Sequence, residues 1–263
     1  MKHIISFSGG LGSYFTLKRV LEKVDKENVE LVFCDTLFED DDLYRFVNEV
    51  VEKFKVELVI LCVGKTPVDL AKEDKFLYNS RVANCSKILK SKPFKEYIKS
   101  INEEIVLYFG IDFTESHRCV AIEKHYKDYK VEFPMCKAPY LFKHEMMWFL
   151  DNDEIELPRL YKLGFSHNNC KGRCFKAGIG HFKNLYKKDK CTYLGFEQQE
   201  QEIIKLIGKE VGIMKRKGKP FTLKMLRESI ENNQQLSLFE ENEIGGCGCF
   251  FEEEKERNTK CQK

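Results

Sequence analysis

The first half of the chain alternates short apolar segments with amphipathic ones, and this alternation limits the possible folds more than any other feature. Apolar, β-prone segments predict strands at residues 3–8, 29–35, 57–63 and 104–110. Apolar residues at helical spacing predict helices near residues 13–24, 39–54, 86–99 and 116–127. Strands that alternate with helices predict an α/β fold, in which a mostly parallel sheet is covered by helices on both faces.

The alternation of strands and helices ends near residue 142, where a helical segment is followed by an acidic connection and a cysteine-rich stretch. Further helices are predicted near residues 194–211 and 222–231. We therefore expect a nucleotide-binding α/β domain over 1–141 and a helical, cysteine-rich region over 142–250. The last residues, 251–263, are polar and are expected to be disordered.

Composition predicts a cytoplasmic protein with no membrane association. The longest apolar run, LVILCV at 58–63, is too short to span a bilayer, and no secretory leader is expected. The formal net charge is only +2, so a basic surface for nucleic acid would have to be local. Eleven cysteines in such a protein favour metal or redox chemistry over a disulfide framework.

A glycine-rich turn, SFSGGLGSY at 6–14, follows the first predicted strand and leads into a helix. Glycines allow close approach of a ligand to the backbone, and the N–H groups at a helix start favour an anion. The turn lacks the lysine of a Walker A loop, so backbone amides and serine hydroxyls would hold the phosphate, which suits a pyrophosphate leaving group. The alternative is a tight turn without a ligand. The predicted binding residues are Ser8, Gly9, Gly10, Leu11, Gly12 and Ser13.

The SGGLGS loop resembles the PP-loop of the adenine-nucleotide α-hydrolase superfamily. Four more segments, in family order, resemble its phosphoadenylyl-sulfate (PAPS) reductase branch: FCDTLFED (33–40), SRVANCSKILKSKPF (80–94), GIDFTESHR (110–118) and APYLFKHEMMWFL…LYKLGFSHNNC (138–170). The resemblance implies ATP or PAPS as the nucleotide. It further implies nucleotide contacts by Asp35, Thr36, Glu39, Arg81, Glu115 and Arg118. Many ATP pyrophosphatases carry Asp where this chain has Gly12, so Mg²⁺, if bound, would use Asp35 or Asp112.

Three cysteines are candidate metal ligands. Cys170 and Cys174 flank a small basic loop, and Cys85 lies at a predicted helix start, two settings that favour thiolates. The resemblance implies that Cys85 and the later pair are iron–sulfur ligands, although thiolates suit Zn²⁺ as well as a [4Fe–4S] cluster. A fourth ligand could be Cys136, Cys247 or Cys249. The alternative is a set of unrelated reduced cysteines.

Two segments of the tail carry separate predictions. Cys247 and Cys249, in GGCGCF, match the position of the reductase tail and are predicted to be catalytic thiols, with metal ligation as the alternative. QLSLF, Gln235 to Phe239, resembles the short motif that docks bacterial replication and repair proteins on the sliding clamp. Its apolar side chains could instead pin the tail to this protein's own core.

We therefore expect an enzyme that binds an adenine nucleotide and couples cleavage at the α-phosphate to sulfur chemistry. With PAPS, a tail cysteine would attack sulfur and release sulfite. With ATP, an adenylylated acceptor, including a nucleic acid, would receive sulfur from a cysteine or a cluster. The alternative is a non-catalytic nucleotide-binding regulator or defence-related module, which Gly12 in place of Asp keeps open.

Overall fold

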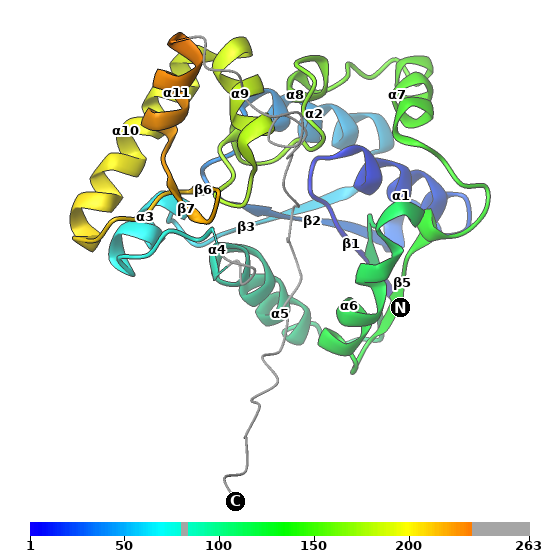
Figure 1. The fold of residues 1–263 in the computed structure, drawn as a ribbon. Coiled ribbons are helices and arrows are strands. Elements are labelled where there is room, and N and C mark those ends of the chain that lie inside the picture. Colours follow the sequence, from blue (N-terminus) through cyan, green and yellow to red (C-terminus); the bar gives the residue numbers. More distant parts are fainter. Residues whose placement is uncertain (80–83, 233–263) are drawn as a thin grey trace, which may run out of the picture.

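A five-stranded parallel sheet forms the centre of the molecule (Figure 1). The computed structural model describes residues 1–79 and 84–232. The strands are β1 (Lys2–Ser6), β2 (Val29–Asp35), β3 (Glu57–Cys62), β4 (Ile105–Phe109) and β5 (Lys130–Glu132). They lie in the order β3-β2-β1-β4-β5, and every neighbouring pair is parallel. The predicted α/β fold is confirmed. The strand order reverses at β1, because β2 lies on one side of it and β4 on the other. In such sheets a crevice forms at the carboxyl ends of the two strands where the order reverses, here β1 and β4.

Apolar side chains on successive strand residues pack on opposite faces of the sheet, as a strand buried on both sides requires. In β1, Ile5 faces a core cluster with residues of α1 (Leu11–Leu21), α2 (Asp41–Phe54) and α7 (Lys143–Asn152). Its neighbour Ile4 faces a second cluster with α5 (Lys92–Lys99) and α6 (Cys119–His125). Helices therefore cover both faces, as predicted (Figure 1).

Two predicted helices are interrupted in the structure. The segment predicted at 86–99 is composed of α4 (Asn84–Ser86), a π-helical turn η2 (Lys87–Ser91) and α5. The segment predicted at 116–127 begins as a 3₁₀ helix, η3 (Phe113–Arg118), before α6. π-Helical turns are rare and are found most often at functional sites, and η2 carries Lys90, a residue of the candidate site.

The remaining helices form the cysteine-rich region and its contacts. They are α3 (Pro67–Glu73), α8 (Arg159–Lys162), α9 (Ile179–Lys188), α10 (Lys190–Ile207) and α11 (Leu223–Glu231), with the 3₁₀ turn η5 (Cys170–Gly172). Two further 3₁₀ turns, η1 (Lys26–Asn28) and η4 (Pro134–Cys136), belong to the α/β part and contact β2 and α1, respectively. A third core cluster joins the cysteine-rich region to Phe38 and Leu89 of the first half. The predicted boundary at 141 stays a prediction, and residues 233–263 lie outside the described part. Within the described part, no helix combines the length and apolarity required to cross a membrane.

A buried carboxylate fastens the small hairpin β6 (Met214–Arg216) and β7 (Lys219–Phe221) to α10. Glu200 is fully buried and accepts hydrogen bonds from the N–H of Ile213 at 2.9 Å and of Leu223 at 2.7 Å. The pKa of Glu200 is nevertheless raised from 4.5 to about 7, because burial outweighs the two N–H donors.

We predict that Glu200 makes the free energy of unfolding fall as pH rises from about 4.5 to about 7. The folded state holds the proton of Glu200 in that range while the unfolded state has released it, so raising the pH favours unfolding, by about 3 kcal/mol at most. Urea titrations of the wild type and of Glu200→Gln at several pH values measure how much of the pH dependence of the unfolding free energy comes from Glu200. Glu210→Gln, at an exposed position, is the control. An unchanged pH slope in Glu200→Gln would contradict the assignment.

Candidate nucleotide site

A cavity of about 540 Å³ lies at the carboxyl ends of β1 and β4. Its wall is built from five segments: the loop after β1, Lys90 of η2, the loop after β4 with η3, the start of α7, and the stretch from Tyr161 to Asn169. Seven residues predicted from the sequence line it: Ser8, Gly10, Leu11, Gly12, Ser13, Glu115 and Arg118. The chain therefore brings the glycine-rich loop and the distant Glu-Ser-His-Arg segment to one cavity. That they contact a nucleotide stays a prediction.

Steric contacts and hydrogen bonds define the shape of the loop after β1. Gly9 has a φ of +70°, and a Cβ there would lie 2.9 Å from Leu43 Cγ, so both conformation and space require glycine. Ser13 Oγ donates to the Gly10 carbonyl at 2.8 Å. From the C-terminal half, Asn168 Nδ2 donates to the Gly9 carbonyl at 2.9 Å, and the Tyr161 hydroxyl accepts from Leu11 N–H at 3.2 Å.

Helix α1 presents its N-terminus to the cavity. Its N-cap residue is Gly10, which has no side chain to cap the helix, and its first turn contains no acidic residue. The N–H groups of the first turn and the helix dipole both favour an anion at this position. The site therefore has the backbone arrangement that the sequence predicts for a phosphate.

Two glycines bring helix α1 into backbone contact with the loop after β4. A Cβ at Gly12 would lie 2.4 Å from the Gly110 carbonyl oxygen, and a Cβ at Gly110 would lie 2.5 Å from Ser13 N. A larger residue, including aspartate, cannot occupy position 12 unless one backbone moves. Of the two alternative Mg²⁺ ligands, Asp112 lines the cavity and caps η3 through Thr114 N–H at 2.8 Å. Asp35 is not among the lining residues, and its carboxylate accepts hydrogen bonds from the Tyr44 hydroxyl and from the Leu37 N–H.

Charged groups reach the cavity from two sides. Lys90, on η2, is buried, and its Nζ lies 3.2 Å from Glu39 Oε1. Thr36, predicted to contact the nucleotide, donates to the same Glu39 oxygen at 3.0 Å and does not line the cavity. On the other side, Arg118 Nη1 lies 2.9 Å from Glu115 Oε1. Both cations are thus held in position by carboxylates.

The segment from Ser166 to Asn168 supplies neutral polar groups. Burial lowers the pKa of His167 to about 4, so its imidazole is uncharged near neutral pH. Among the described residues, Ser166 Oγ and Asn168 Oδ1 are buried and have no hydrogen-bond partner. Buried polar groups are normally paired, and both residues line the cavity. A polar ligand would satisfy them.

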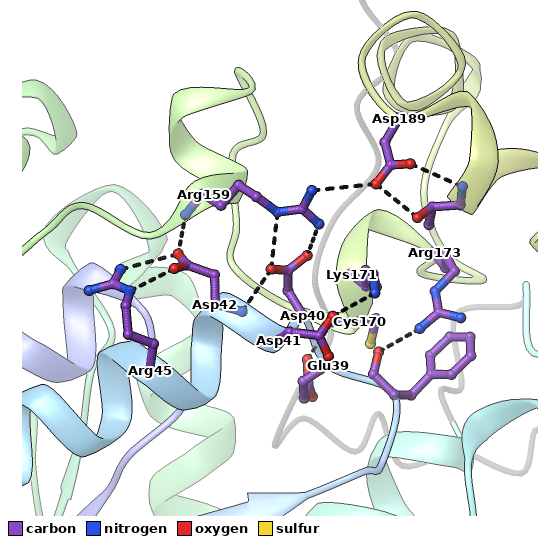
Figure 2. A network of polar contacts seen from close by, with 12 residues as sticks. Glu39, Asp40, Asp41, Asp42, Arg45, Arg159, Cys170, Lys171, Arg173 and Asp189 are labelled. Carbon is purple, nitrogen blue, oxygen red and sulfur yellow. Dashed lines mark hydrogen bonds and ion pairs between the residues drawn. The ribbon is translucent and has the colours of Figure 1, made fainter.

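The acidic start of α2 holds the cysteine loop beside this site (Figure 2). Buried Asp40 pairs with Arg159 of α8, and Asp41 lies 3.0 Å from Lys171 Nζ. Glu39 accepts from Cys170 N–H. The Arg173 guanidinium lies 3.6 Å from the centre of the Phe38 ring and donates to the Phe38 carbonyl at 3.1 Å.

The predicted metal ligands share one environment without forming a recognisable metal site. Cys85, Cys170 and Cys174 all pack against the third core cluster. Among residues 1–79 and 84–232, no group of three or more His, Cys, Asp or Glu side chains is arranged to hold a metal ion. Cys136, one candidate for the fourth ligand, packs instead against the second cluster.

Several predicted residues lie outside the described part of the chain: Arg81, Cys247, Cys249 and the segment Gln235 to Phe239. The sequence predictions missed the lining residues Lys90, Lys143, Tyr161, His167 and Asn168. All five lie within segments that carried the family resemblance, so that resemblance was the available signal. Their individual roles became visible only when the segments came together.

The chain is similar to a known protein family over more than half of its length. A family model described as phosphoadenosine phosphosulfate reductase domain matches residues 2–170. Similar solved structures include the PAPS reductase from Candida auris in a phosphate complex, with a TM-score of 0.48 and 17% identity over 64% of this chain and 82% of that chain. They also include the U34-tRNA thiolase NcsA from Methanococcus maripaludis with its [4Fe-4S] cluster, with a TM-score of 0.43 and 13% identity over 79% and 70% of the two chains. No curated protein matches.

We predict that Gly12→Ala destabilises the protein and removes nucleotide binding. The added methyl group meets backbone atoms, which cannot move aside as a side chain does, so a loss of about 1–3 kcal/mol or more in unfolding free energy is expected. Thermal unfolding and calorimetry with ATP and PAPS measure both effects.

Gly195→Ala is the matched control for this test. Gly195 lies in α10 with nothing within 4 Å of its added Cβ, so alanine should be neutral or stabilise by up to about 1 kcal/mol. Equal stability and affinity of the two variants would show that the Gly12–Gly110 contact does not shape the site.

Proposed function

The chain belongs to the phosphoadenosine phosphosulfate reductase domain family, and on that premise we propose that it is an enzyme that cleaves ATP or PAPS at the α-phosphate. The observation that carries the proposal is the uncapped N-terminus of α1, which opens into a 540 Å³ cavity lined by Lys90 and Arg118. Phosphate oxygens would accept from the first-turn N–H groups of α1. The two cations would neutralise charge that develops on the leaving group.

The described residues support binding and orientation of the nucleotide. Ser8 and Ser13, on the loop, offer hydroxyls to phosphate oxygens. The unpaired Asn168 Oδ1 would accept a hydrogen bond from a base or a sugar hydroxyl. His167, kept neutral by burial, would exchange hydrogen bonds without adding a charge.

Two reactions are compatible with this site. With PAPS, a thiolate attacks sulfur, the bond from sulfur to the α-phosphate oxygen breaks, and a nucleotide leaves. A second thiol then displaces sulfite and closes a disulfide. With ATP, an acceptor oxygen attacks the α-phosphorus and pyrophosphate leaves, after which a sulfur nucleophile displaces AMP. Cys247 and Cys249 are proposed as the two thiols of the PAPS reaction. In the ATP reaction one of them would carry a persulfide, received from a persulfide donor, whose outer sulfur displaces AMP; the other thiol then attacks the inner sulfur, releases the thiolated acceptor and closes a disulfide. A nucleic acid is one proposed acceptor.

A second candidate function is a nucleotide-binding module without catalysis. The contact of Gly12 with Gly110 favours it, because that contact leaves no room for a carboxylate at position 12. Product analysis separates the two functions. Pyrophosphate, AMP or sulfite from ATP or PAPS supports the enzyme, and binding without any of these products supports the module.

Metal binding by Cys85, Cys170 and Cys174 remains a proposal, supported by their packing against one core cluster. The described side chains do not form a metal-binding group, and the proposed nucleotide chemistry does not depend on one. A contact of Gln235 to Phe239 with a sliding clamp likewise remains a prediction, because that segment lies outside the described residues.

We predict that Arg118→Gln weakens nucleotide binding by about 10- to 100-fold. The change removes a charged hydrogen-bond donor from the cavity and leaves Glu115 without its 2.9 Å ion pair, so a carboxylate would then repel the phosphates. Calorimetry with ATP and PAPS measures the dissociation constants. Lys209→Ala, at an exposed position outside the cavity lining, should bind like the wild type. Wild-type affinity in Arg118→Gln would argue against nucleotide binding in this cavity.

We predict that protein purified without oxygen contains iron and sulfide, or zinc, and that Cys170→Ser loses most of it. A thiolate contributes much of the free energy of such a site, and serine replaces it poorly. Elemental analysis and a visible spectrum give the result. Cys191→Ser, at an exposed position, should retain the metal. A metal-free wild type, or full occupancy in Cys170→Ser, would refute the ligand assignment.

A further inference from the structure

Two thiols face each other behind the wall of the cavity. Cys119 is the first residue of α6 and Cys136 is the last residue of η4. Their sulfur atoms lie 3.7 Å apart, and both side chains are partly buried. Cys136 Sγ also donates to the carbonyl oxygen of Ile111 at 3.2 Å, and Ile111 lines the cavity. The proposed nucleotide chemistry uses neither thiol.

We propose that Cys119 and Cys136 are a redox-active dithiol that closes to an intrachain disulfide by exchange with a low-molecular-weight disulfide. One protein thiolate attacks a sulfur of the small disulfide and displaces one small thiolate, leaving a mixed disulfide. The second protein thiolate then attacks the protein sulfur of that bond and displaces the other small thiolate. Two protein thiols are oxidised, the small disulfide is reduced to two thiols, and the two protons pass to them.

The order of attack follows from the surroundings of the two sulfurs. Burial raises the pKa of both thiols, and it raises that of Cys136 to about 12. The neighbouring Arg118 acts in the opposite direction on Cys119. We assign the first attack to Cys119, which adjoins Arg118, and the second to Cys136, whose S–H is held by the Ile111 carbonyl. Because burial raises the pKa of each thiol, the exchange is expected to be slow at neutral pH.

Closure requires only a local movement. A disulfide needs its sulfurs at about 2.05 Å, so the pair must approach by less than 2 Å, roughly the range of side-chain rotation and a small backbone shift. Glu115, four residues before Cys119, already has non-helical φ and ψ values within η3. The backbone between the cavity wall and Cys119 therefore contains a kink at which such a shift can occur.

The bond would connect the end of η3, whose Arg118 lines the cavity, to η4, which is not among the lining segments. Cys119 follows Arg118, whereas η4 is attached to helix α1 through Arg19, which donates to the Pro134 and Lys137 carbonyls at 2.6 and 2.9 Å. Oxidation would also remove the S–H that Cys136 donates to Ile111. We therefore expect several-fold weaker nucleotide binding in the oxidised protein, an expectation that rests on the proposed function.

The test is peptide mapping of the full chain after equilibration with oxidised glutathione and alkylation of the remaining thiols. Trypsin cleaves after Arg118, Lys124, Lys130 and Lys137, so the disulfide joins peptides 119–124 and 131–137. The expected result is this cross-linked pair in folded protein, which dithiothreitol reverses. Cys119→Ser should lack it, and Cys191→Ser should retain it.

Alkylation of both cysteines in folded protein, or a cross-link that forms only in denaturant, would overturn the dithiol. Calorimetry on the oxidised and reduced forms then tests the coupling. Weaker binding in the oxidised form supports it, and equal affinity refutes it. Absence of nucleotide binding in both forms would refute the proposed function while the cross-linked peptide still establishes the dithiol.

Discussion

The backbone contact between helix α1 and the loop after β4 is the constraint on which the candidate site depends. Gly12 and Gly110 meet at a distance that no side chain could occupy. Because α1 follows β1 directly, this contact fixes the direction of its N-terminus relative to the adjacent strand β4. The same loop leads into η3, so Glu115 and Arg118 line the same cavity as the N-terminus of α1. The close contact of Gly12 with Gly110 thus brings the N–H groups of α1 and the charged side chains of η3 to one cavity.

The acidic start of α2 has a comparable role for the C-terminal half. Glu39 joins three groups from separate segments, namely Thr36, Lys90 and Cys170 N–H. Asp40 is almost fully buried and pairs with Arg159. Buried carboxylates are costly without such partners, so these contacts favour one arrangement of the segments over others. The stretch that follows α8 then closes the cavity with Tyr161, His167 and Asn168.

The sequence was informative where local pattern determines local structure. Four strands were placed within two residues of their observed bounds, and SGGLGS was correctly placed where the chain passes from β1 into α1, although the helix begins two residues earlier than predicted, at Leu11. The three-residue strand β5 was missed because so short a segment carries no clear alternation. Lys90 was missed because lysine-rich helices usually face solvent, and only the tertiary structure buries it beside Glu39. That Thr36 contacts a nucleotide stays a prediction; in the structure its hydroxyl donates to Glu39.

The hydrogen bonds of Tyr161 and Asn168 to the glycine-rich loop join residues about 150 positions apart. The loop is thus preorganised by the far half of the chain, and little conformational entropy remains to be lost when a ligand arrives. Thermodynamic reciprocity adds a consequence. If docking of the 161–168 segment raises the affinity of the loop, an occupied loop must stabilise that docking by the same free energy. Ligand binding to the loop and docking of the 161–168 segment are therefore coupled, so a change in either one can be measured through the other.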